Sequence, residues 1–309
     1  MKLPDIKVYR SNFEEQGLVL PLPVIPGHKD GLLDVLPTPP TGKTGWPWTE
    51  QTDAGLYNDG TFWPKLTIVT PSYNQGTFIE ETIRSILLQN YPNLEYIVID
   101  GGSSDQTVEI LKKYSPWISY WRSEKDRGQG HAINLGFSLA AGDYYAWINS
   151  DDYYLAKVFH RIARTFINTR VKFIYGYGLS YQVSKNQFDL VKVLPFWDFF
   201  IKIPSLLQPS TFWAAYINQP IWEVLNCSLD FELWLRLVKG QKRKLIKEPL
   251  SVAHMHLDSK TMDPGMKQKW EADHLNIWSD EGHGQVYEWK RIMFLNRVRM
   301  KLYKLLNWI

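Results

Sequence analysis

The sequence of 309 residues has one cysteine, no long hydrophobic run and little net charge. Cys227 alone cannot form an internal disulfide or a cysteine-based zinc site, so nothing here indicates an oxidising compartment. No stretch approaches the roughly 18 apolar residues of a membrane-spanning helix, and no apolar run follows Lys2. We therefore expect neither a transmembrane span nor a signal peptide, and a cytoplasmic location. The formal charge of +3 is too small to predict nucleic-acid binding.

The first 64 residues differ in composition from the rest of the chain. Many of the prolines lie there and no hydrophobic periodicity is sustained, so we expect residues 1–64 to form an extended arm on the main domain. Gly42-Lys43-Thr44 resembles the end of a phosphate-binding loop, but Pro37 stands where that motif has glycine, which excludes it. Trp46-Pro47-Trp48 either packs the arm down or touches a ligand.

Strand and helix patterns alternate four times after the arm. The expected strands cover residues 66–70, 94–100, 117–121 and 144–149, and the expected helices cover 77–90, 105–114 and a segment ending near 141. Thr77 and Glu80 have the spacing of a capping box. Short links between alternating strands and helices predict right-handed crossovers, hence an α/β fold with a doubly wound, mainly parallel sheet.

Polar residues follow several of these strands directly. They are Pro71 to Asn74, Asp100, Asp126 with Arg127, and Asp151 with Asp152. Because the carboxyl ends of parallel strands meet at one edge of a sheet, where ligands of open α/β sheets bind, we expect these residues to lie close together.

Asp151 and Asp152 suggest a metal site. Carboxylate oxygens suit Mg²⁺ or Mn²⁺, which proteins usually hold with one or two carboxylates and the phosphate oxygens of a substrate. Adjacent aspartates after a strand also serve as helix caps, so the pair alone leaves both interpretations open.

The last segment, Glu288 to Ile309, has the pattern of one amphipathic helix with six basic residues and a single acid. Such a helix either lies on an anionic membrane surface or packs on its own domain with a solvated basic face. The first alternative would make the protein peripheral on the inner face of the cytoplasmic membrane.

Six blocks of sequence occur in the order typical of one enzyme family. They are TPSYNQGTFIEETIRSILLQNYPNLEYIVIDGGSSDQT, SEKDRGQGHAINLG, WINSDDYY, QPSTFW, LDFELWLRL and HMHLDSKT. Together they resemble the bacterial family 2 glycosyltransferases of GT-A fold over about residues 64 to 262. The resemblance implies a GT-A domain at 65–262, with a nucleotide-binding half at 65–153 and an acceptor half at 154–262. The remaining residues, 263–309, are expected to form a helical tail.

The resemblance assigns nucleotide-binding roles in the first half. Tyr73 would stack on the base, commonly uracil, and Thr70 and Pro71 would shape the loop around it. Asp100 would accept a hydrogen bond from the base, and Arg127 would hold the base or a phosphate.

The resemblance also places the family's metal-binding block at residues 149–152. Asn149 and Ser150 would contact the nucleotide, although the family often has Asp at the position of Asn149. Asp151, followed by Asp152, would bind Mn²⁺ or Mg²⁺, and His256 would complete the coordination or contact the diphosphate.

On the acceptor side, the resemblance identifies Asp230 as the general base of an inverting transfer, because the acceptor hydroxyl must lose its proton as it attacks. Gln208, Trp213, Glu232 and His254 would line the acceptor or sugar pocket. A lone histidine is more often structural, and this alternative is open for His254.

The sequence thus predicts a metal-dependent inverting glycosyltransferase. The donor would be a nucleotide-diphosphate sugar, with a UDP-sugar favoured, and the acceptor a saccharide or a lipid-linked group in surface polysaccharide synthesis. The alternative is a non-catalytic nucleotide-sugar binding scaffold, which gains from Asn149 and from Leu229, where relatives carry an acid. A nucleotidyltransferase is not supported, because the expected phosphate loop after the first strand, PSYNQG, has no basic residue. A dinucleotide-dependent oxidoreductase is not supported either, because no G-x-G-x-x-G follows a strand.

Overall fold

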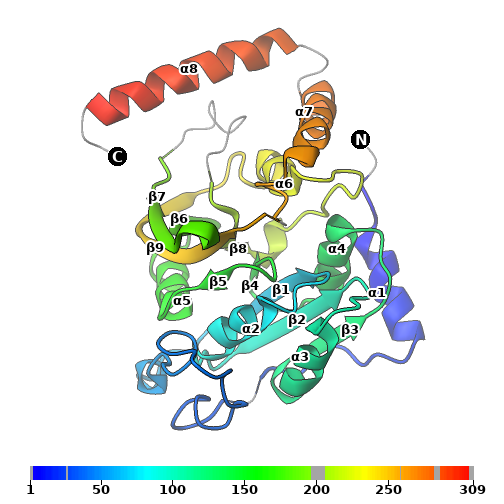
Figure 1. Ribbon diagram of the computed structural model, residues 1–309, viewed down its shortest axis with the longest axis vertical. Coiled ribbons are helices and arrows are strands. Elements are labelled where there is room, and N and C mark those ends of the chain that lie inside the picture. Colours follow the sequence, from blue (N-terminus) through cyan, green and yellow to red (C-terminus); the bar gives the residue numbers. More distant parts are fainter. Residues whose placement is uncertain (1–2, 26, 196–205, 258, 282–285, 306–309) are drawn as a thin grey trace.

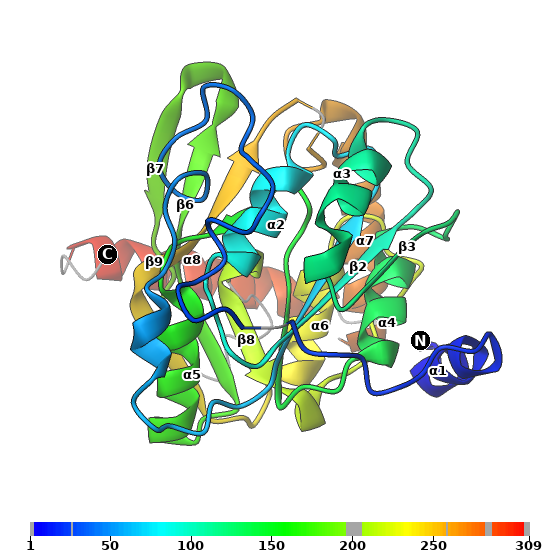
Figure 2. The ribbon, with the colours of Figure 1, turned by 90° about the horizontal axis from the view of Figure 1, so that it is seen from below.

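One mixed β-sheet organises the protein (Figures 1 and 2). The computed structural model describes residues 3–25, 27–195, 206–257, 259–281 and 286–305. Across the described part, the sheet has the strand order β3 (Tyr120–Ser123), β2 (Leu94–Asp100), β1 (Leu66–Ser72), β4 (Tyr144–Trp147), β8 (Thr211–Ala214), β6 (Phe173–Gln182), β9 (Arg243–Met255) and β5 (Tyr153–Tyr154). A ninth strand, β7 (Gln187–Val191), pairs with β6 at its outer end.

The nucleotide-binding half predicted from the sequence is the parallel part of this sheet. β3, β2, β1 and β4 are all parallel, with Leu66 opposite both Leu94 and Tyr144. The connecting helices are α2 (Ile79–Leu87), α3 (Thr107–Tyr114) and α4 (Gln129–Leu139). Every residue of β1 and β2 is buried, because helices cover both faces of these strands.

The other half of the sheet is mixed. β8 runs antiparallel to β4 and to β6, whereas β6 and β9 run parallel. Two helices accompany these strands, α5 (Val158–Thr169) and α6 (Leu229–Leu237). In the described part of the chain, the short 3-10 segments are Ala54–Tyr57, Ser115–Trp117, Val183–Lys185, Gln208–Ser210, Ala215–Ile217 and Pro264–Met266.

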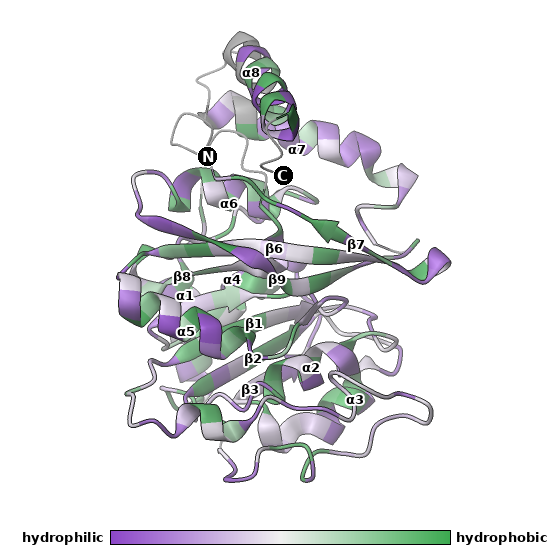
Figure 3. Ribbon diagram, turned by 90° about the vertical axis from the view of Figure 1, so that its left-hand side faces the viewer, coloured by the Kyte–Doolittle hydropathy of each residue, from purple (hydrophilic) through white to green (hydrophobic). Residues whose placement is uncertain are grey.

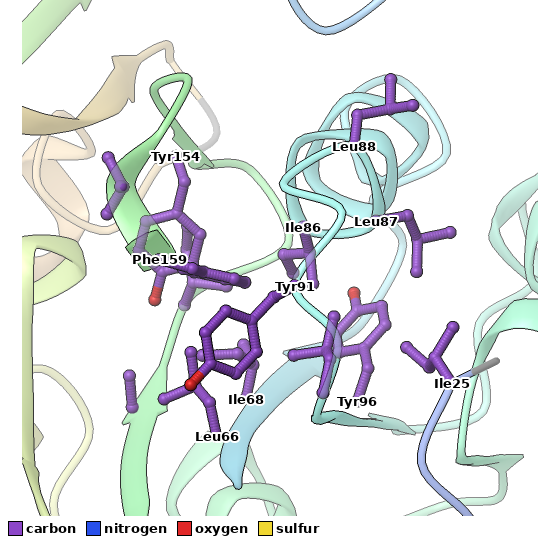
Figure 4. Close-up of a cluster of buried hydrophobic side chains, with 14 of the residues drawn as sticks. Ile25, Leu66, Ile68, Ile86, Leu87, Leu88, Tyr91, Tyr96, Tyr154 and Phe159 are labelled. Carbon is purple, nitrogen blue, oxygen red and sulfur yellow. The ribbon is translucent and has the colours of Figure 1, made fainter. Parts of the chain in front are cut away.

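Two hydrophobic cores lie on opposite faces of the sheet. Val69 and the apolar residues of α4 and α6 belong to one core, and Ile68 and those of α2 and α5 to the other. Consecutive residues of β1 thus contribute to different cores, as alternation along a strand requires. Figure 4 shows the second core, where Tyr91 and Tyr96 lie among aliphatic side chains of α2.

The arm is not extended throughout. Helix α1 (Ile6–Glu15) is capped by the Asp5 side chain, which accepts from Lys7 N, and it buries Phe13 against the body beside α4. Further on, the arm is fixed by Arg84 of α2, which is fully buried. Its guanidinium donates to the carbonyls of Pro37 (2.8 Å), Pro47 (3.0 Å) and Trp48 (2.8 Å).

Two local predictions need correction. The first strand does not end at Thr70 as expected, because β1 continues through Pro71 to Ser72 and pairs up to Asp100 of β2. The capping box is absent, since Phe78 occupies the cap position of α2 and no side chain caps it. Instead, Asp105 accepts from Gly76 N at 2.8 Å, so the turn before α2 is held by the neighbouring loop.

The tail consists of α7 (Lys267–Glu281) and α8 (Val286–Leu305), which lies apart from the sheet (Figure 3). Residues 306–309 of the predicted helix lie outside the described residues. Phe294, Val298 and Leu302 of α8 are exposed, whereas Arg299 is buried. Among the described residues, no helix combines the length and the apolar character needed to cross a membrane.

Candidate functional site

The site lies where β1, β2 and β4 end, joined by the end of β9. Tyr73 follows β1, Asp100 ends β2, Asp151 follows β4 and His256 follows β9. The parallel pairing of β2 with β1 and of β1 with β4 brings three of these ends to one edge. His256 joins them through a 3.1 Å contact with Asp151, although the two residues are 105 positions apart.

Tyr73, predicted to bind the nucleotide, is exposed, with 62% of its surface accessible. The loop beneath it is fixed by Asn74, which has a left-handed backbone (φ 51°) and whose Oδ1 accepts from Ser104 N at 2.9 Å. Thr70 is buried and accepts a hydrogen bond from Tyr96 at 3.3 Å, and Pro71 is buried beside it. A rigid loop thus presents an aromatic ring to solvent.

Asp100 is fully buried and its carboxylate is occupied by the loop that follows. It accepts from the backbone N–H groups of Gly102 (3.2 Å) and Ser103 (2.8 Å) and from the hydroxyls of Ser103 (2.5 Å) and Ser123 (2.6 Å). A direct contact of Asp100 with a base would require one of these bonds to be exchanged.

Asp151 and His256 form the centre of the site. Asp151 Oδ2 lies 3.1 Å from His256 Nε2, and the imidazole stacks on Phe78 with ring centroids 4.5 Å apart. His254 is fixed nearby, with Nδ1 2.5 Å from the carbonyl oxygen of Asp151. Burial lowers the pKa of His254, which favours the neutral imidazole with Nδ1–H donating to that carbonyl.

This pair fits a divalent cation. Neighbouring ligands of an octahedral ion at about 2.1 Å are roughly 3 Å apart, which is the separation of Asp151 Oδ2 and His256 Nε2. The described residues contain no group of three or more His, Cys, Asp or Glu placed to hold a metal. With Asp151 and His256 as protein ligands, phosphate oxygens of a substrate and water would supply the others.

Asp152 is directed into the protein rather than toward this pair. It is 6% exposed, and its carboxylate accepts from His254 N at 3.2 Å and from Asn149 Nδ2 at 3.5 Å. Burial, followed by the charge of Asp151, raises its pKa well above the usual range. Ser150 is also buried, and its carbonyl accepts from Thr82. Asp151 is therefore the better placed of the two aspartates to bind a metal.

Asp230 lies in the first turn of α6, and burial raises its pKa. The loop before α6 is held by Asp273 of α7, which is 1% exposed. Its Oδ2 accepts from three consecutive backbone N–H groups, those of Asn226 (2.9 Å), Cys227 (2.6 Å) and Ser228 (3.1 Å). The position of the predicted base thus depends on a residue of the tail.

Four predicted site residues, Arg127, Glu232, Trp213 and Gln208, form hydrogen bonds or ion pairs with other groups of the protein. Arg127 pairs with Glu223 at 2.8 Å and donates to Tyr9 of the arm at 2.7 Å.

Glu232 is buried and forms an ion pair with Arg236 one helical turn along α6. Trp213 is fully buried in the first core, where its indole N–H donates to Asn218 at 3.0 Å, and Gln208 is 9% exposed and donates to the carbonyl of Trp147 at 2.8 Å. In this structure the side chains of Glu232 and Trp213 are both buried.

The family model described as "Glycosyl transferase family 2" matches residues 67–223. An uncharacterized glycosyltransferase of Rickettsia typhi is 30% identical over 235 residues, which cover 71% of this chain and 72% of that protein.

Two solved structures have a similar fold. One is residues 1–349 of S. aureus TarS in complex with UDP-GlcNAc (TM-score 0.53, 18% identity, 65% of this chain and 61% of that one). The other is a mannosyltransferase of Pyrobaculum calidifontis in complex with GDP-Man and Mn²⁺ (TM-score 0.53, 14% identity, 77% of this chain and 68% of that one). These likenesses confirm the predicted GT-A fold.

Proposed function

The chain belongs to glycosyl transferase family 2, and on that premise we propose that it moves a sugar from a nucleotide-diphosphate sugar to an acceptor hydroxyl with inversion at the anomeric carbon. As a member of the family it is a glycosyltransferase. The favoured donor is a UDP-sugar, and the favoured cofactor is Mn²⁺ or Mg²⁺. The similar structures were solved with UDP-GlcNAc and with GDP-Man and Mn²⁺, which supports a donor and a cation of these classes.

The observation that carries the proposal is the contact of Asp151 with His256 at the sheet edge where β1 ends and the exposed Tyr73 follows. Tyr73 would stack on the base and leave the diphosphate to extend toward Asp151. When bound there, the cation would neutralise negative charge on the departing diphosphate. Phe78 and His254 would keep the two protein ligands in place, because one stacks on His256 and the other bonds to the backbone of Asp151.

Asp230 would accept the proton of the acceptor hydroxyl. A raised pKa suits this role, because a carboxylate with weak affinity for protons is a poor base. The first turn of α6 presents this carboxylate, and Asp273 holds the preceding loop in register.

The acceptor side of the proposal is a saccharide or a lipid-linked group in cell-surface polysaccharide synthesis. The exposed face of α8 supports a membrane contact, since Phe294 (65% exposed) and Leu302 (53% exposed) are accompanied by exposed Lys290 and Lys301. We expect the protein to sediment with anionic liposomes and to be released by salt. Equal binding by a chain that ends before α8 would contradict this membrane contact.

The test of the function is donor hydrolysis and donor-induced thermal shift over a panel of nucleotide-sugars, with Mn²⁺, with Mg²⁺ and with EDTA. We expect a metal-dependent response to one donor, which Asp151→Asn abolishes and Asp34→Asn, at an exposed position in the arm, preserves. Wild-type turnover by Asp151→Asn would refute the metal assignment. Binding without any turnover would favour the scaffold instead.

A further inference from the structure

A chain of hydrogen bonds links Lys260, which follows His256 by four residues, to the end of β4. Lys260 Nζ donates to Gln129 Oε1 at 2.8 Å, and Gln129 Nε2 donates to Asn149 Oδ1 at 2.8 Å. Asn149 Nδ2 in turn is 3.5 Å from Asp152 Oδ2. Because an ammonium group only donates, the direction of each amide along this chain is fixed.

The charge of Lys260 is not cancelled by its hydrogen-bond acceptors. Besides Gln129, Nζ donates to the carbonyl of Asn226 at 2.7 Å, and both acceptors are neutral. Two of its three N–H groups are used in this way, which leaves the third for a ligand. Burial lowers its pKa, and the nearby Cys227, Asp273 and Asp151 act in the opposite direction.

Arg127 offers a contrast. It was predicted to be the cation at the nucleotide, but the Glu223 carboxylate compensates its charge at 2.8 Å and its side chain is 60% exposed. The departing nucleoside diphosphate carries more negative charge than the intact donor, and the Asp151 carboxylate offsets part of a divalent cation's charge, so a protein cation at the site would strengthen binding.

We propose that Lys260 binds the diphosphate of the donor and that Gln129 and Asn149 position its ammonium group at the end of β4. This inference rests on the proposed function and adds a residue to its donor site. It also gives Asn149 a role that an aspartate could not fill. The amide both accepts from Gln129 and donates toward Asp152, and it adds no third negative charge next to Asp151 and Asp152.

The test compares binding of nucleoside diphosphates with binding of the matching nucleosides, by calorimetry without acceptor. UDP, GDP, uridine and guanosine are the probes, and the proteins are wild type, Lys260→Gln, Lys260→Arg and the control Lys267→Gln at an exposed position. We expect Lys260→Gln to weaken diphosphate binding about 10- to 100-fold, as for the loss of one charge-assisted hydrogen bond, and to leave nucleoside binding within about twofold. Lys260→Arg should restore part of the loss, and Lys267→Gln should behave as wild type.

The outcomes separate this inference from the proposed function. If wild type binds a diphosphate and Lys260→Gln binds it equally well, the inference is wrong and the function stands. A parallel loss of diphosphate and nucleoside binding would mean that Lys260 only supports the fold, which also overturns the inference. If wild type binds neither diphosphate, the proposed function fails and the inference with it.

Discussion

Removal of the Asp273 side chain should destabilise the protein and disable transfer without weakening donor binding. Asp273 lies on α7, yet it holds the loop of residues 226–228 that leads into α6 and Asp230. Replacement by alanine leaves three backbone N–H groups without their acceptor. Ser228 is fully buried, so its N–H would have the poorest access to water.

The expected loss can be worked out from these contacts. A hydrogen bond to a charged group contributes about 1.5–3 kcal/mol. The three N–H groups share one oxygen, and Asn226 is exposed enough for its N–H to bind water after the change, so the contributions do not simply add. We expect Asp273→Ala to lower the free energy of unfolding by about 2–4 kcal/mol, or to lower Tm by about 3–6 °C for a chain of this size.

Three measurements check this prediction. Thermal and urea unfolding give the stability, and Glu271→Ala, at an exposed position on the same helix, is the matched control. Amide hydrogen exchange should accelerate at residues 226–228 before it does elsewhere. Sugar transfer should fall because Asp230 loses its position, while donor affinity should remain near that of wild type. Unchanged exchange at these three amides, together with wild-type stability, would refute the reasoning.

Three further predictions concern other parts of the molecule. Asp230→Asn should keep donor affinity but lose transfer. Burial raises the pKa of Asp230, and a base acts in its deprotonated form, so transfer by the wild type should decline on acidification at a higher pH than it would with an exposed aspartate. A pH–rate profile checks this. Gly136→Ala should cost about 1–3 kcal/mol in urea unfolding, because the new methyl group would overlap Val69 of β1, whereas Gly27→Ala meets open space and should be neutral. Arg84→Met should lower the free energy of unfolding by about 3–5 kcal/mol and expose the arm to proteases, because it leaves buried carbonyls unpaired. The control Arg161→Met removes a surface ion pair and should lower it by less than about 1 kcal/mol. Equal effects of the two substitutions would contradict this prediction.

The central strands could be predicted from sequence because burial on both faces leaves continuous apolar runs. The expected strand at 94–100 coincides with β2 for this reason. Helix starts were harder to predict. Thr77 has the sequence signature of a cap, but Asp105 and Thr107 hold the turn from a neighbouring loop about 30 residues away. Helix α1 also escaped prediction, because its stability comes from packing beside α4 and not from a long periodic pattern.

The residues at the sheet edge could be predicted because they follow strands in recognisable blocks. Asp151 and His256 were expected together, and their side chains are in contact. Asp273 and Glu223 left no such signal, because each is a single acid whose importance depends on partners 45 to 96 positions away. Trp213 shows the opposite case, since a motif residue can match a family pattern and still serve the core.

The region matched by the family model is not a complete folding unit without the arm. Phe13 and Leu22 of the arm enter the core on one face of the sheet, and Leu32 and Trp63 enter the core on the other. The region that the family model matches, residues 67–223, therefore shares both of its interiors with sequence outside it. A chimera that transplanted only that region into a relative would have two incomplete hydrophobic cores. Recombination that preserves a working enzyme should instead exchange the arm and the sheet together, so we expect their apolar contact residues to vary in concert among related chains.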